Sequence, residues 1–185
     1  EFLDYALPSN IESQSQVKLE LAQQSINLIK NMIQNSIFAR DTLITCSEIH
    51  MTLINICKRI PLLASHCLSA LLAIFADPEE MEAFVIEQTV DPIFEIFSSN
   101  ISQENCNRAI LQLLFQIMIL LCNARSIISE LFYQKNLAPL VLNFLNDPDL
   151  CSLVIHLIGH LSLSESAIES GFVNHDFILS MIQLL

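Results

Sequence analysis

The sequence EQTVDPIFEIF at residues 87–97 has a counterpart in QKNLAPLVLNFL at residues 134–145. A weaker third copy, ESGFV, begins at residue 169 and continues to Phe177 and Ile178. We interpret each copy as the end of one helix, a turn residue, an apolar residue, and a new helix opened by proline or a polar cap. A chain that repeats this phrase is predicted to be a stack of helical repeats.

The residues predicted to end the helices in the three copies are Thr89, Asn136 and Gly171. Glycine and asparagine tolerate the left-handed conformation found at helix C-termini, whereas the β-branched Thr89 suits it least. Pro92 and Pro139 suit the first turn of the next helix, where a missing N–H group costs no hydrogen bond. The copies lie 47 and 35 residues apart, near the period of about 40–47 residues that some helical repeats show.

The composition limits both the fold class and the classes of partner. Apolar residues make up 52% of the 185 residues, and only two glycines occur, so tight turns between strands are disfavoured. The net charge of −12 opposes binding to nucleic acid or to an anionic membrane, since both require a basic footprint. The same charge permits a basic peptide or protein partner, although an acidic solubilising surface explains it more simply.

The cysteines form no C-x-x-C pair and fall among Leu and Ile, where a free thiol acts as a small apolar side chain. They are Cys46, Cys57, Cys67, Cys106, Cys122 and Cys151. This usage predicts a reducing compartment, cytoplasmic or nuclear, although the sequon at residues 100–102 points weakly the other way. The apolar stretch at residues 110–122 is too short to span a bilayer, so we expect no membrane span and a buried helix containing Leu113 and Ile117.

Start and stop signals predict an all-α protein of about ten helices. A first helix is expected at residues 12–35, followed by one that Asp41 or Thr45 caps and that ends at Arg59. Ser102 is expected to cap one of the long helices that form the middle of the stack, at residues 61–76, 103–122 and 148–163. Shorter helices are expected at residues 77–88, 92–99, 126–135, 139–145, 164–170 and from residue 174 onward.

The 12–35 helix carries an apolar stripe made of Val17, Leu21, Leu28 and Met32 and widened by Ile29 and Ile33. The opposite side is rich in Gln, Asn and Ser, as expected of a terminal helix with one side in water. Residues 1–40 are therefore predicted to be an N-terminal tail and capping helix. Residues 41–185 are predicted to form three to four repeats in one continuous solenoid.

Two segments carry a resemblance to a known family. DPDLCSLVIHLIGHL at residues 147–161 resembles the third helix of an armadillo unit, which reads roughly D-P-E-V-x-x-x-A-L-W-A-L-S-N-L. VIEQTVDPIF at residues 85–94 resembles the joint between the first and second helices, commonly V-V-E-A-G-A-V-P-x-L. The chain is thus similar to the armadillo repeat superfamily over residues 41–185. The resemblance implies a right-handed α-solenoid of armadillo-type repeats, whose third helices line a concave groove.

The best-known armadillo families, importin-α and the β-catenin-like proteins, bind extended peptides along that groove. In importin-α-like members a Trp on each third helix stacks on a lysine side chain, and an Asn four residues later holds the peptide backbone. The matching positions here are Ser69 and Ala73, Gln116 and Leu120, and His156 and His160. The chain contains no Trp, so a lysine-rich peptide lacks its usual aromatic cradle.

On the armadillo register, the partner groove is expected to be lined by Ser69, Gln116, Asn123, His156 and His160. His156 and His160 lie one helical turn apart, a spacing that also suits two metal ligands. A polar pair on the groove face is the simpler interpretation, and its charge would change between about pH 5 and 7.

No catalytic or cofactor motif occurs in the sequence, so we expect neither enzyme activity nor a cofactor. We expect a protein-interaction scaffold that binds a partner peptide or helix in the groove. The alternative is a divergent importin-α-like nuclear transport adaptor for basic cargo peptides. The apolar Leu184 and Leu185 predict self-association through the C-terminal repeat, or a chain that is a fragment of a longer array.

Overall fold

A computed structural model describes residues 7–76, 83–102 and 106–172 of the chain. Within these ranges the regular structure is entirely helical, as the sequence predicted, with ten α-helices, one short 3-10 helix and no strand. The elements are α1 (Leu7–Asn35), α2 (Ile37–Ser47), α3 (Ile49–Arg59), η1 (Pro61–Leu63), α4 (Ala64–Ile74), α5 (Ala83–Ile101), α6 (Arg108–Ala124), α7 (Ser126–Gln134), α8 (Leu137–Leu142), α9 (Cys151–Leu161) and α10 (Glu165–Glu169).

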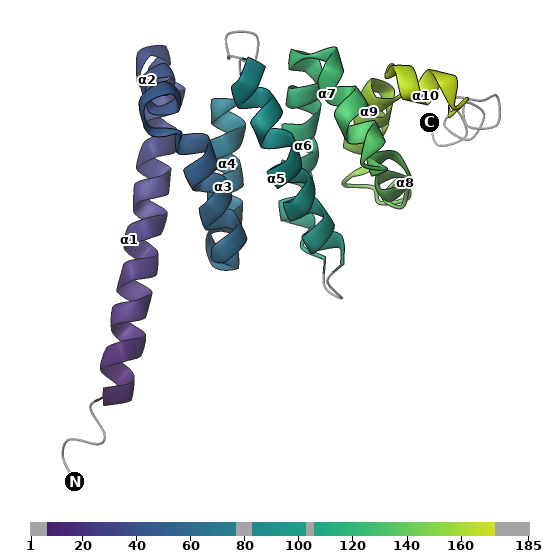
Figure 1. The fold of residues 1–185 in the computed structure, drawn as a ribbon. Coiled ribbons are helices and arrows are strands. Elements are labelled where there is room, and N and C mark those ends of the chain that lie inside the picture. Colours follow the sequence, from purple (N-terminus) through teal and green to yellow (C-terminus); the bar gives the residue numbers. More distant parts are fainter. Residues whose placement is uncertain (1–6, 77–82, 103–105, 173–185) are drawn as a thin grey trace.

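The helices form an elongated row with α1 at one end and α10 at the other (Figure 1). In one series α1 packs against α4, α4 against α6, and α6 against α9. In a second series α3 packs against α5, and α5 packs against α7. The two series also contact each other, since α3 packs against α4, α5 against α6 and α7 against α9. Side chains between the two series form one continuous core.

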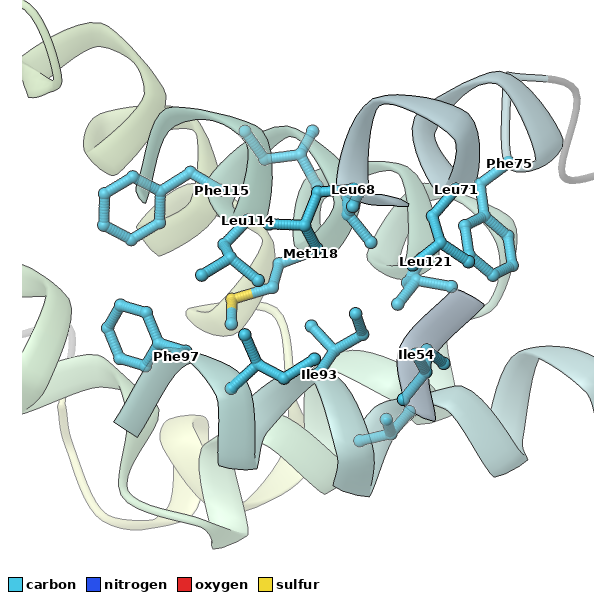
Figure 2. Packing of buried hydrophobic residues seen from close by; sticks show 14 of the residues in the cluster. Ile54, Leu68, Leu71, Phe75, Ile93, Phe97, Leu114, Phe115, Met118 and Leu121 are labelled. Atoms are coloured by element: carbon cyan, nitrogen blue, oxygen red, sulfur yellow. The ribbon is translucent and has the colours of Figure 1, made fainter. Parts of the chain in front are cut away.

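Helix α6 lies at the centre of this core because it is apolar on nearly every side. It packs against α4, α5, α7 and α9. Eight of its seventeen residues are buried: Leu111, Leu114, Phe115, Ile117, Met118, Ile119, Leu121 and Cys122. Figure 2 shows Leu114, Met118 and Leu121 of α6 between Leu68 of α4 and Ile93 of α5. The predicted burial of the 110–122 stretch is thus confirmed for most of its apolar residues, whereas Ile110, Leu113 and Leu120 are only half-buried.

The predicted break between residues 89 and 92 is wrong, because α5 runs through it as one helix with Pro92 inside. Thr89 is buried and its hydroxyl donates to the Val85 carbonyl at 2.8 Å. The proline removes one backbone hydrogen bond, which is the local reason to expect a break. The helix persists because Val90, Ile93 and other apolar residues on both sides of that point are buried in the core.

The other two copies of the phrase do end helices as predicted. Asn136 has φ 58° and Gly171 has φ 66°, both in the left-handed region. A third left-handed residue was not predicted. Glu48, with φ 45°, separates α2 from α3, so neither Asp41 nor Thr45 caps a helix and both lie inside α2.

The left-handed backbone conformation of Glu48 predicts that glycine at this position would stabilise the chain. Glu48→Gly should raise the free energy of unfolding by about 0.5–1 kcal/mol, since relief of the left-handed backbone exceeds the entropic cost of glycine. The matched change Glu87→Gly, at an exposed position inside α5, should lower it by about 1 kcal/mol. Urea unfolding followed by circular dichroism measures both values, and a loss of stability in both variants would contradict the prediction.

The predicted apolar stripe of the first helix is a core face only along one edge. Ile33, which widened it, is buried and Ile29 is half-buried, whereas Val17, Leu21, Leu28 and Met32 are exposed. Ile26, on the side opposite these four exposed residues, is buried as well. Helix α1 contacts α4 through that opposite side. The predicted end of the helix at Asn35 is confirmed, and the predicted domain boundary after residue 40 falls inside α2.

The remaining helices follow the predicted order with shifted ends. Asn107, not Ser102, caps α6, and its side-chain oxygen accepts hydrogen bonds from the N–H groups of Ala109 and Ile110 at 3.1 and 3.3 Å. The long helices predicted from Pro61 and Pro148 begin as α-helices three residues later, at Ala64 and Cys151. The start signal at residues 77–80 and the helix expected from residue 174 lie outside the described residues.

His50 in α3 makes the core sensitive to acid. Its side chain is buried, and neither ring nitrogen has a hydrogen-bond partner. Burial lowers the pKa of His50 from its ordinary value of 6.5, with nearby Glu48 acting in the opposite direction. The folded state therefore binds this proton less readily than the unfolded state does, and stability is lost as the pH falls below about 6.5.

We expect His50→Leu to reduce that loss, because leucine fills the site without a titrating group. The free energies of unfolding of both proteins should be measured in urea between about pH 7.5 and 5. The wild type should lose more stability than the variant over this interval. Equal losses would show that protonation of His50 is not linked to unfolding.

Candidate functional site

The five residues predicted to line a groove all retain contact with solvent. Asn123 and His156 are exposed, whereas Ser69, Gln116 and His160 are half-buried. They lie on three helices that pack in succession, with α6 between α4 and α9. We call the surface defined by Ser69, Gln116, Asn123, His156 and His160 the neutral face.

Ser69 stands at a junction that also involves α1. The Lys30 ammonium donates a hydrogen bond to the Ser69 hydroxyl at 2.7 Å, and Gln23 Nε2 lies 2.6 Å from His66 Nε2. Lys30, His66 and Ser69 line a depression of about 380 Å³, which Leu113 of α6 also lines. Gln116 follows Leu113 by one helical turn, so the neutral face continues from this depression along α6.

The participation of α1 was not predicted, although the sequence held a signal for it. Gln23, Asn27 and Lys30 recur at intervals of three and four residues and therefore share one side of the helix. The sequence predicts that this polar side faces water, because the apolar stripe elsewhere on α1 is the expected contact surface. Asn27 and Lys30 instead line the depression next to α4.

His156 and His160 form the second part of the neutral face. Their rings stack with centroids 5.3 Å apart and an angle of 22° between the planes. The Nε2 atom of His160 is buried without a hydrogen-bond partner. Both residues line a depression of about 490 Å³ beside Gly159, where an added Cβ would meet no atom within 4 Å. The depression therefore gives a partner side chain room beside Gly159 and the two rings, whereas the His160 Nε2 atom itself is out of contact with solvent.

The environment of His160 favours its neutral ring. Burial lowers the pKa of His160, and the neighbouring His156 lowers it further. A neutral imidazole offers one donor and one acceptor, whereas a protonated ring offers two donors. Acidification thus changes the hydrogen-bonding capacity of this end of the neutral face.

The charge of the neutral face differs sharply from that of the whole chain. Helices α4, α6 and α9 contain no Asp or Glu, and Arg108 is their only Lys or Arg residue. The acidic residues of the described helices lie elsewhere, as Glu87, Asp91 and Glu95 do on α5. The net charge of −12 is therefore carried mainly outside these three helices.

A further depression, of about 450 Å³, was not predicted. Its lining includes Cys57, Lys58, Glu95, Asn100 and Asn107, from α3, α5 and the start of α6. Lys58 forms an ion pair with Glu95 across its edge. Burial raises the pKa of the Cys57 thiol to about 11, so the thiol is protonated at neutral pH and is a poor nucleophile.

The predicted role of the cysteines as small apolar residues is confirmed for Cys57, Cys67 and Cys122, which are buried. Burial raises the pKa of both Cys67 and Cys122 to about 12. Asn100, the first residue of the sequon, is also buried, and its amide donates to the Asn107 carbonyl at 3.4 Å. This asparagine is therefore not accessible for glycosylation in the folded chain.

The described residues show no metal site and no membrane span, and the chain matches no known protein in the comparisons made. Among the described residues, no group of three or more His, Cys, Asp or Glu could hold a metal ion. None of the helices in the described ranges is long and apolar enough to cross a membrane. Comparisons with models of known protein families, with curated proteins and with solved structures found no match to this chain. The neutral face is thus the feature of the molecule from which we infer a function.

Proposed function

We propose that this chain is a non-catalytic scaffold of armadillo-like helical repeats, which binds an extended peptide or a helix of a partner protein along the neutral face. The observation that carries the proposal is the absence of acidic residues from three successive helices of a chain with net charge −12. An acidic solubilising surface that avoids one side of the molecule leaves that side suited to close contact with another chain.

The side chains of the neutral face suit recognition of a polypeptide backbone. The Gln116 amide donates and accepts hydrogen bonds, and so do the Ser69 hydroxyl and a neutral His160 ring. The two depressions, one beside α4 and one along α9, offer places for partner side chains. Such a surface holds the partner through main-chain hydrogen bonds with modest demands on its sequence.

The face offers little to a lysine-rich peptide. It lacks both tryptophan and carboxylates, and Lys30, which donates a hydrogen bond to Ser69 of this face, is itself basic. A basic segment is better matched to the acidic α5, where Glu87, Asp91 and Glu95 lie. We therefore place the importin-α-like transport adaptor second to the scaffold.

The test begins with peptides selected from a random display library on the immobilised protein. Gln116→Ala, and the double change His156→Ala with His160→Ala, should each weaken binding of the selected peptides by about tenfold. Gln88→Ala is the matched control, since Gln88 is exposed on α5. It should change affinity by less than about twofold, the effect of an inert surface change. A larger loss in the control than in the other variants would place the binding surface outside the neutral face.

A labelled lysine-rich peptide separates the two functions. The scaffold proposal predicts weak binding that salt abolishes and that Gln116→Ala leaves unchanged, because the attraction comes from carboxylates elsewhere. Micromolar or tighter binding that Gln116→Ala weakens would instead favour the transport adaptor.

A further inference from the structure

Helix α1 exposes an apolar stripe that no described part of the chain covers. Val17, Leu21 and Leu28 are 62%, 67% and 61% exposed, and Met32 is 45% exposed. The four side chains fall within about 60° of the helix circumference, since successive residues are about 100° apart. Ile26 and Ile33 point the other way and are buried. Helix α1 is the terminal helix of the row (Figure 1), and contiguous apolar surfaces of this kind mark contact sites.

The spacing of the four stripe residues is symmetric along the helix, and this symmetry indicates which kind of partner covers the stripe. Its members are separated by four, seven and four residues, a pattern that reads the same in both directions along the helix. Two antiparallel copies of α1, related by a twofold axis between Gln24 and Ser25, therefore place Val17 opposite Met32 and Leu21 opposite Leu28. A twofold contact of this kind requires a self-complementary surface, which this spacing supplies.

We propose that two copies of this chain associate through the antiparallel pairing of their α1 helices along this stripe. The exposed charges at its borders do not oppose the arrangement. The same register places Lys18 opposite Asn31 and Glu20 opposite Ile29, so no two like charges face each other. Gln24 and Ser25, both exposed, meet across the axis, where their polar groups retain access to water and to one another.

The distribution of charge over the whole chain also favours α1 as the contact. Helix α1 contains Glu12, Glu20, Lys18 and Lys30 and has no net charge, although the chain carries −12. Association through α1 keeps the acidic helices of the two copies away from the interface. The remaining repulsion between two anionic copies is screened by salt, so raising the ionic strength should strengthen the dimer rather than dissociate it.

Sedimentation equilibrium of the full chain at high micromolar concentration tests the association. The wild type should have about twice the mass of the double variant Leu21→Glu with Leu28→Glu, because two carboxylates on each stripe would face apolar groups. Leu62→Glu with Leu163→Glu is the matched control, since both leucines are exposed away from α1, and it should retain the dimer. Circular dichroism shows whether each variant is folded. A monomeric wild type, or a Leu21 and Leu28 double variant that remains dimeric, would overturn the proposal.

Cysteine cross-linking tests the antiparallel register independently of affinity. A mixture of Leu21→Cys and Leu28→Cys chains should form a disulfide-linked dimer, because these positions face each other across the twofold axis. Each variant alone should cross-link no more than the wild type, in which Cys57, Cys67 and Cys122 are buried and the half-buried Cys106 and Cys151 set the background. Efficient cross-linking of Leu21→Cys with itself would indicate parallel helices and overturn the assignment.

Discussion

Ile117→Asp should leave the chain unfolded under conditions in which the wild type is folded. Ile117 is fully buried in α6, the helix that packs against α4, α5, α7 and α9. An unpaired carboxylate at this position costs several kcal/mol, a large part of the roughly 5–15 kcal/mol that stabilises a typical domain. Far-UV circular dichroism and a urea titration should show loss of helix and of the cooperative transition.

Leu113→Asp is the matched control on the same helix. Leu113 is half-buried and lines the depression shared with α1 and α4, so a carboxylate there reaches water. The sequence predicted that both residues are buried, whereas in the structure Ile117 is buried and Leu113 is half-buried. Leu113→Asp should keep a cooperative transition, with a loss of no more than about 1–2 kcal/mol. Equal damage from both changes would show that the solvent-facing side of α6 has been assigned wrongly.

Phe115→Ala is expected to have the second-largest effect. The Phe115 ring is fully buried, and its centroid lies 5.7 Å from that of Phe97 and 5.9 Å from that of Phe144. It therefore joins α5 and α6 to the segment that follows α8. Removing the ring leaves a cavity and ends both aromatic contacts, so the free energy of unfolding should fall by about 3–5 kcal/mol.

The control for this prediction is Phe38→Ala. Phe38 is 81% exposed in α2, and its removal should change stability by less than about 0.5 kcal/mol. Urea unfolding in dilute solution measures both variants without a contribution from association. If Phe115→Ala cost as little as Phe38→Ala, the aromatic cluster around Phe97 would not be part of the stabilising core.

Local sequence signals succeeded where the cause of a structure is itself local. Asn136 and Gly171 end helices because few other residues adopt the left-handed conformation at low cost. Ser164 caps α10 because its hydroxyl accepts a hydrogen bond from the Ala167 N–H at 3.3 Å. The apolar run of α6 predicted a buried helix since such a helix has no side that water would stabilise.

The same local reasoning failed at residues 89–92, because tertiary burial outweighed it there. Pro92 has no backbone N–H group, so a helix that continues through it loses one hydrogen bond, and this loss favours a helix end. Burial of Val90 and Ile93 on the continuous face of α5 contributes more than that bond. The helix ends predicted at Asn136 and Gly171 are thus present and the one predicted at Thr89 is not. The second half of the third copy lies outside the described residues.

The armadillo resemblance implied that Ser69, Gln116, Asn123, His156 and His160 share one surface. All five contact solvent, and their role in binding stays a prediction. The exposed fraction of each side chain could not be predicted from the sequence. The same holds for the contacts of Ser69 with Lys30 and of His66 with Gln23, which join residues far apart in the chain. Only the packing of α1 on α4 creates these contacts.

The sequence alone determined that this protein is all-helical, where most helices lie, and that α6 is buried. Tertiary structure decided which side of each amphipathic helix meets a neighbour. Helix α1 shows the difference, because its periodicity identifies the residues that share a side but not the side that α4 contacts. The apolar stripe around Leu21 and Leu28 stayed exposed, while Ile26 and Ile33 entered the core. The reason is that burial depends on the combined free energy of both packed surfaces, and one helix specifies only its own.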